Sequence, residues 1–233
     1  ERQEAMDRFA REGSVASEIN HPNIVKILGF GIADVEKIPY IAMEYIEGIN
    51  LTTFMEKNKS CPMHKRLGII CDVAEALSAV HDQNICHRDV KPGNIIINKS
   101  GLAKLTDFGL ASLPDSTLTM VTSLMGSPAY MSPEAYKSSK VDHRADLFSL
   151  GVVAYELLVG KLPFNARNLA MLAYQMQNPN PTPPRKIRAE IPEDLERVLM
   201  KLLAKLPHDR YQMASRIVDE LRVIQDICRE RKL

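Results

Sequence analysis

The sequence lacks the features that mark several classes of protein. It has 233 residues and no tryptophan, and no apolar run in it approaches the roughly 18 residues that a membrane span requires. The most apolar stretch, from Leu147 to Val159, is interrupted by Ser149 and Glu156. Neither sign of charge is in excess, because 30 Lys and Arg stand beside 29 Asp and Glu. We therefore expect no nucleic acid partner and no membrane segment.

Cysteine is also scarce. The four cysteines are Cys61, Cys71, Cys86 and Cys228, and they form no CxxC pair and show no metal-ligand spacing. Cys71 and Cys86 have apolar neighbours and are predicted to be small buried hydrophobic residues. Reduced thiols are typical of cytosolic proteins, so a cytoplasmic location is expected. The chain opens on Glu1 without a signal-peptide pattern, which we interpret as a piece of a longer protein.

The hydrophobic pattern changes along the chain from β-like to helical. Residues 1–19 are charge-rich and helix-like, and that helix should end before Pro22, because a residue that precedes proline disfavours the α conformation. Apolar residues at three-and-four spacing predict a helix over 63–81, and a nearly all-round apolar helix over 143–159 should be buried centrally. The other expected elements are β segments at 24–30 and 38–45, a hairpin at 95–97 and 103–106, and helices at about 192–205 and 212–229. A small sheet followed by a helical body predicts an α+β, two-lobed fold.

Two short loops carry the most informative residues. One reads HRDVKPGN at 87–94, and the other reads DFG at 107–109. Phosphoryl transfer needs a carboxylate to orient a hydroxyl, metal ligands for the triphosphate, and positive charge on the moving group. These loops supply all three. The alternative is an ordinary polar loop, but the order and spacing of the two motifs argue against it.

The two loops, followed by GSPAYMSPE at 126–134, occur in the order and spacing of Hanks-type protein kinases. The chain resembles the C-terminal part of that domain, and most of all its bacterial Ser/Thr members, from Glu12 to about Arg210. The resemblance implies a protein-kinase-like fold whose N-terminal lobe is incomplete. Residues 1–43 would be the remnant of that lobe, and residues 44–233 the hinge and the mainly helical C-terminal lobe.

The resemblance also implies the catalytic roles. Asp89 would be the base that accepts the proton of the substrate hydroxyl, and Lys91 would place its ammonium on the γ-phosphoryl group of ATP. Asn94 and Asp107 would bind Mg²⁺, a hard cation that prefers oxygen ligands. Ser127 stands where threonine is usual, and its hydroxyl would bridge Asp89 and Lys91. The lysine two residues after the base indicates Ser or Thr of a protein as the acceptor.

Three further residues are expected to support the 87–94 loop. His87 should be a buried structural residue near Phe108 rather than an acid or base. Asp146, in the central helix, should hydrogen-bond the backbone of the loop. Glu134 should form an ion pair with Arg210 beneath the segment that binds the protein substrate, where a bidentate contact fixes geometry as well as charge.

The adenine of ATP is expected at the junction of the two lobes. Met43 resembles the gatekeeper, the Glu44 carbonyl and Ile46 amide of the hinge would bond the adenine edge, and Ile96 would be the apolar floor. Asn50 would either contact the ribose or cap the next helix. The nucleotide-binding residues implied in this way are Met43, Glu44, Tyr45, Ile46, Asn50, Lys91, Asn94, Ile96 and Asp107.

The segment between Asp107 and Glu134 resembles an activation loop. Arg88 precedes the base, which is typical of kinases switched by phosphorylation of that loop, because a phosphate facing Arg88 would gain charge-assisted hydrogen bonds. Self-phosphorylation is expected at Thr119, Thr122 or Ser123. The alternative is that this Ser/Thr-rich loop is merely solvated.

Two parts of the family pattern are missing from the sequence. It contains no glycine-rich phosphate loop and no Val-Ala-Ile-Lys strand, and its first lysine is Lys26. The stretch 29–31 lacks the third glycine of such a loop. Glu12 matches the glutamate that normally pairs with the missing lysine, so we expect it to be solvated. The parent protein is therefore predicted to be a kinase, and this chain alone to be inactive or weak.

Two other functions fit part of the pattern. The first is a pseudokinase, a scaffold that recruits partners, but it has no evident need for Asp89, Lys91, Asn94 and Asp107 together. The second is a small-molecule phosphotransferase of related fold, which usually lacks the segment around Glu134 and its arginine partner.

Overall fold

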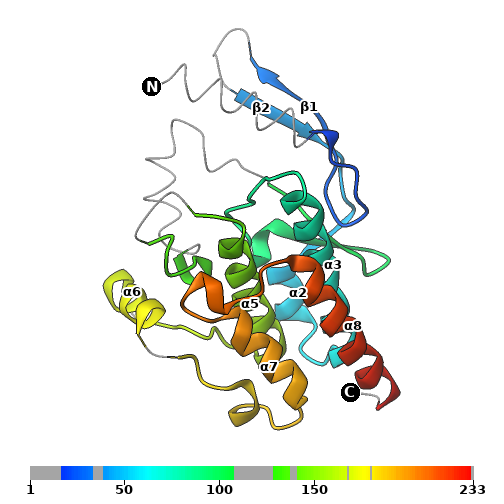
Figure 1. Cartoon of the computed structure of the whole chain (residues 1–233). Helices are drawn as coiled ribbons and strands as arrows, with labels where there is room; N and C mark the ends of the chain where they lie inside the picture. Colours follow the sequence, from blue (N-terminus) through cyan, green and yellow to red (C-terminus); the bar gives the residue numbers. More distant parts are fainter. Residues whose placement is uncertain are drawn as a thin grey trace.

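Two small sheets lie at one end of a helical body in the computed structural model, which describes residues 17–33, 39–107, 128–136, 141–166, 168–178 and 180–231 (Figure 1). Strand β1 (Ile27–Ile32) pairs antiparallel with β2 (Pro39–Met43). The second sheet has the order β3-β4-β5 and is also antiparallel. Its strands are β3 (Gly48–Asn50), β4 (Ile95–Asn98) and β5 (Ala103–Leu105).

The segment just before β1 joins the two sheets. Val25 N–H donates to Leu105 O at 2.9 Å, and Leu105 N–H donates to Asn23 O at 2.8 Å. Ile24 and Val25 are buried at 2 % and 3 % exposure. The first β segment was predicted over 24–30, but its first residues pair with β5 instead of β2, because their apolar side chains are buried against the helical body.

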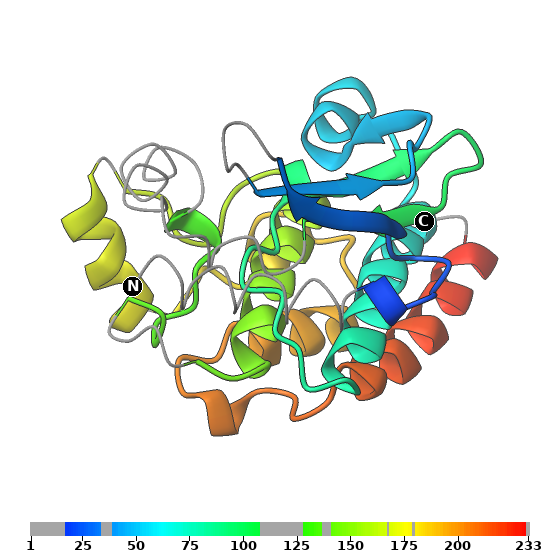
Figure 2. The same cartoon turned by 90° about the horizontal axis from the view of Figure 1, so that it is seen from above.

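Six α-helices make up the body in the described ranges, and Figure 2 shows most of them on one side of the sheets, with the helix at 51–57 on the other. They are α2 (Leu51–Lys57), α3 (Met63–His81), α5 (Arg144–Val159), α6 (Leu169–Gln177), α7 (Glu193–Leu202) and α8 (Ala214–Glu230). Four of these were predicted at nearly the same bounds, and the hairpin β4–β5 is confirmed as well. Helix α6 and strand β3 were missed.

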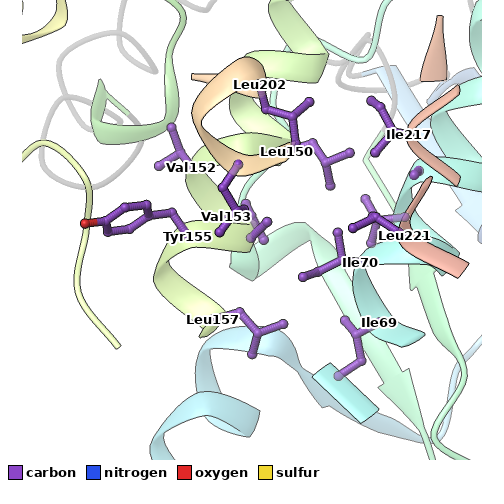
Figure 3. Packing of buried hydrophobic residues seen from close by; sticks show 14 of the residues in the cluster. Ile69, Ile70, Leu150, Val152, Val153, Tyr155, Leu157, Leu202, Ile217 and Leu221 are labelled. Atoms are coloured by element: carbon purple, nitrogen blue, oxygen red, sulfur yellow. The ribbon is translucent and has the colours of Figure 1, made fainter. Parts of the chain in front are cut away.

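Helix α5 lies at the centre of the core, as its all-round apolar pattern predicted. Fourteen of its 16 residues are buried. Figure 3 shows Leu150 of α5 beside Leu202 of α7, with Ile217 of α8 close by. Gly151 permits this close approach, because a Cβ atom there would lie only 2.7 Å from the Cβ of Leu202. Any element attached to α5 is therefore attached to the core.

The four cysteines are free, as predicted, but they differ in burial. Cys71 and Cys228 are buried, whereas Cys61 and Cys86 are half-buried. The prediction that Cys86 is buried was therefore wrong, because this residue lies on the link between α3 and the 87–94 loop and is half-buried. Burial raises the pKa of the Cys71 thiol to about 12 and that of Cys86 to about 11. Both thiols are therefore protonated and poorly nucleophilic at neutral pH.

The predicted helix over 1–19 lies mostly outside the described residues. Among the helices that are described, none combines the length and the apolar character needed to cross a bilayer.

Asp72 links α3 to the β4–β5 hairpin and provides a test of the fold. Its Oδ2 accepts a hydrogen bond from Ala103 N–H at 2.8 Å. Burial raises the pKa of the Asp72 carboxyl to about 6, above the usual value of 3.8. Between these two values the folded state binds more protons than the unfolded state, so the free energy of unfolding should fall as the pH rises through about 6.

We predict that Asp72→Asn removes this part of the pH dependence. Urea unfolding at pH 4.5, 6 and 7.5 measures it, with Asp226→Asn on the exposed face of α8 as the control. The loss of stability between pH 4.5 and 7.5 should be smaller in D72N than in the wild type and in D226N. Identical pH profiles in all three proteins would contradict the assignment.

Candidate active site

The three polar side chains predicted in the 87–94 loop lie together. Lys91 Nζ is 2.6 Å from Asp89 Oδ2. Asn94 Nδ2 donates to Asp89 Oδ2 and to Asp89 O, each at 2.9 Å. Val90 and Asn94 are only 1 % and 6 % exposed, whereas the side chains of Asp89 and Lys91 are 33 % and 27 % exposed. The loop is thus anchored in the core and presents one carboxylate and one ammonium to solvent.

Asp146 holds the start of this loop from the central helix, as predicted. His87 N–H donates to Asp146 Oδ2 at 2.8 Å, and Arg88 N–H donates to Asp146 Oδ1 at 2.7 Å. His81, the last residue of α3, places its ring Nε2 2.9 Å from Asp146 Oδ2. These contacts satisfy a carboxylate that is only 1 % exposed. They also hold Arg88 at φ +66°, a left-handed conformation that is unfavourable for a residue with a side chain.

His87 has the structural role that was predicted for it. It is fully buried, its Nε2 donates to Thr106 O at 2.9 Å, and its Nδ1 accepts from Asp89 N–H at 3.2 Å. Burial lowers the pKa of His87, and the neutral ring fits this pattern of one donor and one acceptor. His87 therefore ties the 87–94 loop to the end of β5. Phe108, its expected neighbour, lies outside the described residues.

Asn94 and Asp107, the predicted metal ligands, are brought together by the backbone. Thr106 N–H donates to Asn94 O at 3.0 Å, so residue 107 follows directly on a point of contact with the loop. Asp107 has φ +63°. Asn94 uses its amide nitrogen on Asp89, which leaves its side-chain oxygen for a cation.

This donor set suits Mg²⁺, which keeps several waters and binds only one or two protein oxygens beside substrate phosphates. In the described ranges no group of three or more His, Cys, Asp or Glu side chains is placed to hold a metal ion by itself. Asn94 and Asp107 would therefore act together with phosphate and water oxygens.

The predicted hinge follows β2, and the side chain of Glu44 holds it to strand β5. Glu44 Oε1 accepts from Lys104 Nζ at 2.7 Å and from Lys26 N–H at 3.0 Å. The hydrogen bond from Lys104 is the main reason that the pKa of Glu44 is lowered. Met43 S accepts from the Thr106 hydroxyl at 3.6 Å, so the predicted gatekeeper lies next to the residue that precedes Asp107. These contacts place the hinge beside the 87–94 loop.

The backbone groups and side chains of the remaining hinge residues are accessible, and their adenine-binding role stays a prediction. No hydrogen bond within the described part of the chain uses Glu44 O or Ile46 N. Tyr45 is 90 % exposed. Ile96 is half-buried and lies on the face of β4 opposite to the buried Ile95 and Ile97. These positions leave two backbone groups and one apolar side chain available to a ligand.

Asn50 fills the second of the two roles considered for it. Its Oδ1 accepts from Thr53 N–H at 2.9 Å, so it caps α2. A ribose contact by Asn50 stays a prediction.

The predicted ion pair between Glu134 and Arg210 is confirmed and is bidentate. Arg210 Nη1 and Nη2 donate to Glu134 Oε1 and Oε2, both at 2.7 Å. The Arg210 side chain is fully buried and also donates to the carbonyl oxygens of Ala204, Lys205 and Arg144. Burial alone would raise the pKa of Glu134, but the hydrogen bonds and charge of Arg210 outweigh it and hold that pKa below its usual value. The pair ties residues 128–136 to the end of the helical body.

Some predicted residues lie outside the described ranges: Glu12, Ser127, Thr119, Thr122 and Ser123. Conversely, the structure adds two residues that the sequence analysis missed, His81 and Lys104. Both act on partners about 60 residues away along the chain, at separations of 65 and 60. No local pattern signals such contacts. The one usable signal for Lys104 was its place on a short strand that ends two residues before Asp107, a predicted metal ligand.

Comparison with known proteins agrees with this geometry. The family described as "Protein kinase domain" matches residues 1–220. A probable serine/threonine-protein kinase of Clostridium perfringens, CPE1738, is 38 % identical over 224 residues, which are 96 % of this chain and 32 % of the relative. The serine/threonine-protein kinase PknB of Mycobacterium leprae is 39 % identical over 218 residues, 92 % of this chain and 35 % of the relative. The chain thus spans about a third of the length of these curated relatives.

Solved structures give the same result. The PknI kinase domain of Mycobacterium tuberculosis superposes with a TM-score of 0.73 at 29 % identity, covering 94 % of this chain and 79 % of that one. The sequence motifs, the paired loops and these similarities define a protein-kinase fold. The chain belongs to the protein kinase family, and the curated relatives it resembles are named as bacterial serine/threonine-protein kinases.

The Glu134–Arg210 pair predicts a large effect on stability. Arg210→Met leaves Glu134 without its partner and three carbonyl oxygens without their donor, so we expect a loss of about 3–5 kcal/mol in the free energy of unfolding. Urea unfolding followed by circular dichroism measures it.

Arg197→Met is the matched control, because Arg197 forms an exposed ion pair with Glu220. This variant should change stability little, since exposed pairs contribute little. Equal losses in the two variants would show that Arg210 is not the buried anchor described above.

Proposed function

We propose that this chain is the phosphoryl-transfer part of an ATP-dependent protein kinase that acts on serine and threonine. The observation that carries the proposal is the joint placement of Asp89, Lys91 and Asn94, with hydrogen bonds and an ion pair of 2.6–2.9 Å, in a loop fixed by buried contacts. A loop that merely connects two elements has no need for a carboxylate held between an ammonium and an amide. The family membership supports the same class of reaction.

In this mechanism Asp89 orients the hydroxyl of a protein Ser or Thr and takes its proton. The hydroxyl oxygen bonds to the γ-phosphorus of ATP while the bond from that phosphorus to the bridging oxygen breaks, and ADP leaves. Lys91 offsets the negative charge on the transferred group, and Asn94 keeps Asp89 in place. Ser127 is proposed to bridge Asp89 and Lys91 through its hydroxyl.

Nucleotide binding completes the proposal. Mg²⁺ held by Asn94 and Asp107 would neutralise the phosphate oxygens. The free carbonyl of Glu44 and amide of Ile46 would bond the adenine edge, with Met43 and Tyr45 beside them, Ile96 beneath the ring and Asn50 near the ribose. The four free thiols fit a reducing compartment such as the cytoplasm, where ATP is available.

The printed sequence contains no glycine-rich loop and no lysine before Lys26, so we expect weak phosphorylation by this chain alone. A fusion tests the cause. The first strands of a homologous bacterial kinase, with their glycine-rich loop and lysine, are joined before Glu1, and transfer of radioactive phosphate from ATP to a generic protein substrate is measured. We predict that the fusion is active, whereas Asp89→Asn lowers its rate by about 10²–10⁴-fold.

Asp82→Asn is the control, because Asp82 is exposed at the end of α3, and it should leave the rate unchanged. A folded but inactive fusion would favour the pseudokinase alternative. Strong activity of the chain without the added strands, lost in D89N, would refute the expected dependence on them.

Self-phosphorylation gives a separate test. We predict that mass spectrometry of the active fusion finds phosphate at Thr119, Thr122 or Ser123, and that changing all three to Ala lowers activity, because no phosphate can then face Arg88. Full activity of the triple variant would show that the loop is only solvated.

A further inference from the structure

Helix α6 lies at the edge of the helical body and has few buried side chains to hold it. Figures 1 and 2 both place it at the periphery, on the same side of the body as residues 128–136. Leu172 and Met176 face inward, but Met171 and Tyr174 are 53 % and 63 % exposed. A short helix of this kind needs a specific contact to fix its position, because helices shorter than about 12–15 residues are marginal by themselves.

Lys205 supplies such a contact from the link after α7. Its Nζ donates to Gln175 O of α6 at 3.0 Å. The same ammonium lies 3.7 Å from the centroid of the Phe164 ring, on the link between α5 and α6. An ammonium at this distance over a ring face is attracted by the ring's negative face, and more strongly where water is excluded. Lys205 thus contacts both α6 and the segment that leads into it.

Phe164 in turn contacts a second ring, Phe148, which contacts a second cation, Arg210, in the core. Phe164 lies nearly parallel to Phe148 of α5, with ring centroids 6.1 Å apart and an interplanar angle of 8°. Arg210 Cζ lies 4.9 Å from the centroid of Phe148. Lys205, Phe164, Phe148 and Arg210 therefore form one stack, which we call the cation–ring stack. Its Arg210 end is the residue that holds Glu134.

The surroundings of the Lys205 ammonium are unusual for a lysine. Within the described ranges Lys205 has no carboxylate partner. Burial, with a smaller contribution from the charge of Arg210, lowers the pKa of Lys205 to about 8. The ring of Phe164 and the carbonyl of Gln175 are the groups that stabilise the ammonium here. A lysine that served only solubility would extend into water instead.

We propose that Lys205 is a positioning residue that couples helix α6 to the Glu134–Arg210 ion pair through the cation–ring stack, so that α6 and residues 128–136 hold their positions together as one surface for the protein substrate. The substrate part rests on the proposed function, whereas the coupling itself is a property of the folded chain. Two rings that lie between a half-buried and a buried cation transmit a displacement, because packed cores are not continuously deformable.

Hydrogen exchange followed by mass spectrometry on this chain, at one pH and without nucleotide, tests the coupling. Lys205→Met removes the ammonium and keeps an apolar chain of similar length. We expect exchange to become about 3- to 30-fold faster in α6 and in residues 128–136, the range that corresponds to losing one cation–ring contact. Exchange in α3 should not change.

The chain offers two informative comparisons. Lys201→Met removes another lysine whose Nζ lies over a ring, 4.1 Å from the Tyr211 centroid, but which is outside the stack, and it should change neither segment. Lys205→Arg keeps a cation over Phe164 and should restore slow exchange in both segments. If K205M does not fold, Phe164→Leu should give the same paired effect, because it removes the ring that joins the two ends.

Faster exchange in α6 alone would mean a merely local packing role and would overturn the proposal. So would no change in either segment, or an equal effect of K205R and K205M, since the cation would then be irrelevant. Because the measurement involves no phosphoryl transfer, its failure would leave the proposed function standing, and an inactive fusion would leave the coupling standing.

Discussion

The hydrogen bonds from His87 and Arg88 N–H to the Asp146 carboxylate are the constraint on which the site depends. Asp146 is 1 % exposed and belongs to α5, the helix that the rest of the core surrounds. A carboxylate in such a place is unfavourable unless donors satisfy it, and two backbone amides and His81 do so. The start of the 87–94 loop is thereby fixed to the most completely buried of the described helices.

The same contacts account for the strained backbone at Arg88, one of two residues of the site with a positive φ. Arg88 and Asp107 have φ values of +66° and +63°. A left-handed conformation costs roughly 1–2 kcal/mol for such a residue, whereas each hydrogen bond to a buried carboxylate contributes about 1.5–3 kcal/mol. The bonds to Asp146 therefore outweigh the strain at Arg88. Strain held in this way by its surroundings is common at functional sites.

A second anchor fixes the other side of the site. Arg210 is buried and bidentate to Glu134, and it is also one end of the cation–ring stack. Two separate buried charges thus hold the two surface segments: Asp146 holds the 87–94 loop, and Arg210 holds residues 128–136. In both cases buried contacts fix the backbone that carries the exposed side chains. Asp89 and Lys91 can therefore be solvent-accessible and still hold a short, fixed contact.

The sequence predicted the parts of the molecule that depend on residues close together along the chain. Helix α3 follows from apolar spacing, α5 from its all-round apolar pattern, and the site from two adjacent motifs. The family resemblance supplied Asp146 and the Glu134–Arg210 pair, which no local pattern shows. The sequence could not reveal His81, Lys104 or Lys205, because their partners are distant along the chain. Helix α6 was missed because its nine residues are too few to show a clear helical period. The start of β1 was misplaced because residues 24 and 25 pair with β5.

The most direct test of the central claim is the rate of amide hydrogen exchange at His87 and Arg88, measured by NMR on the unmodified chain. If Asp146 fixes the loop to α5, these two amides exchange only when the core opens, as slowly as those of Val152 and Val153 in α5. Exchange as fast as that of the exposed Asn84, three and four residues earlier, would contradict the account.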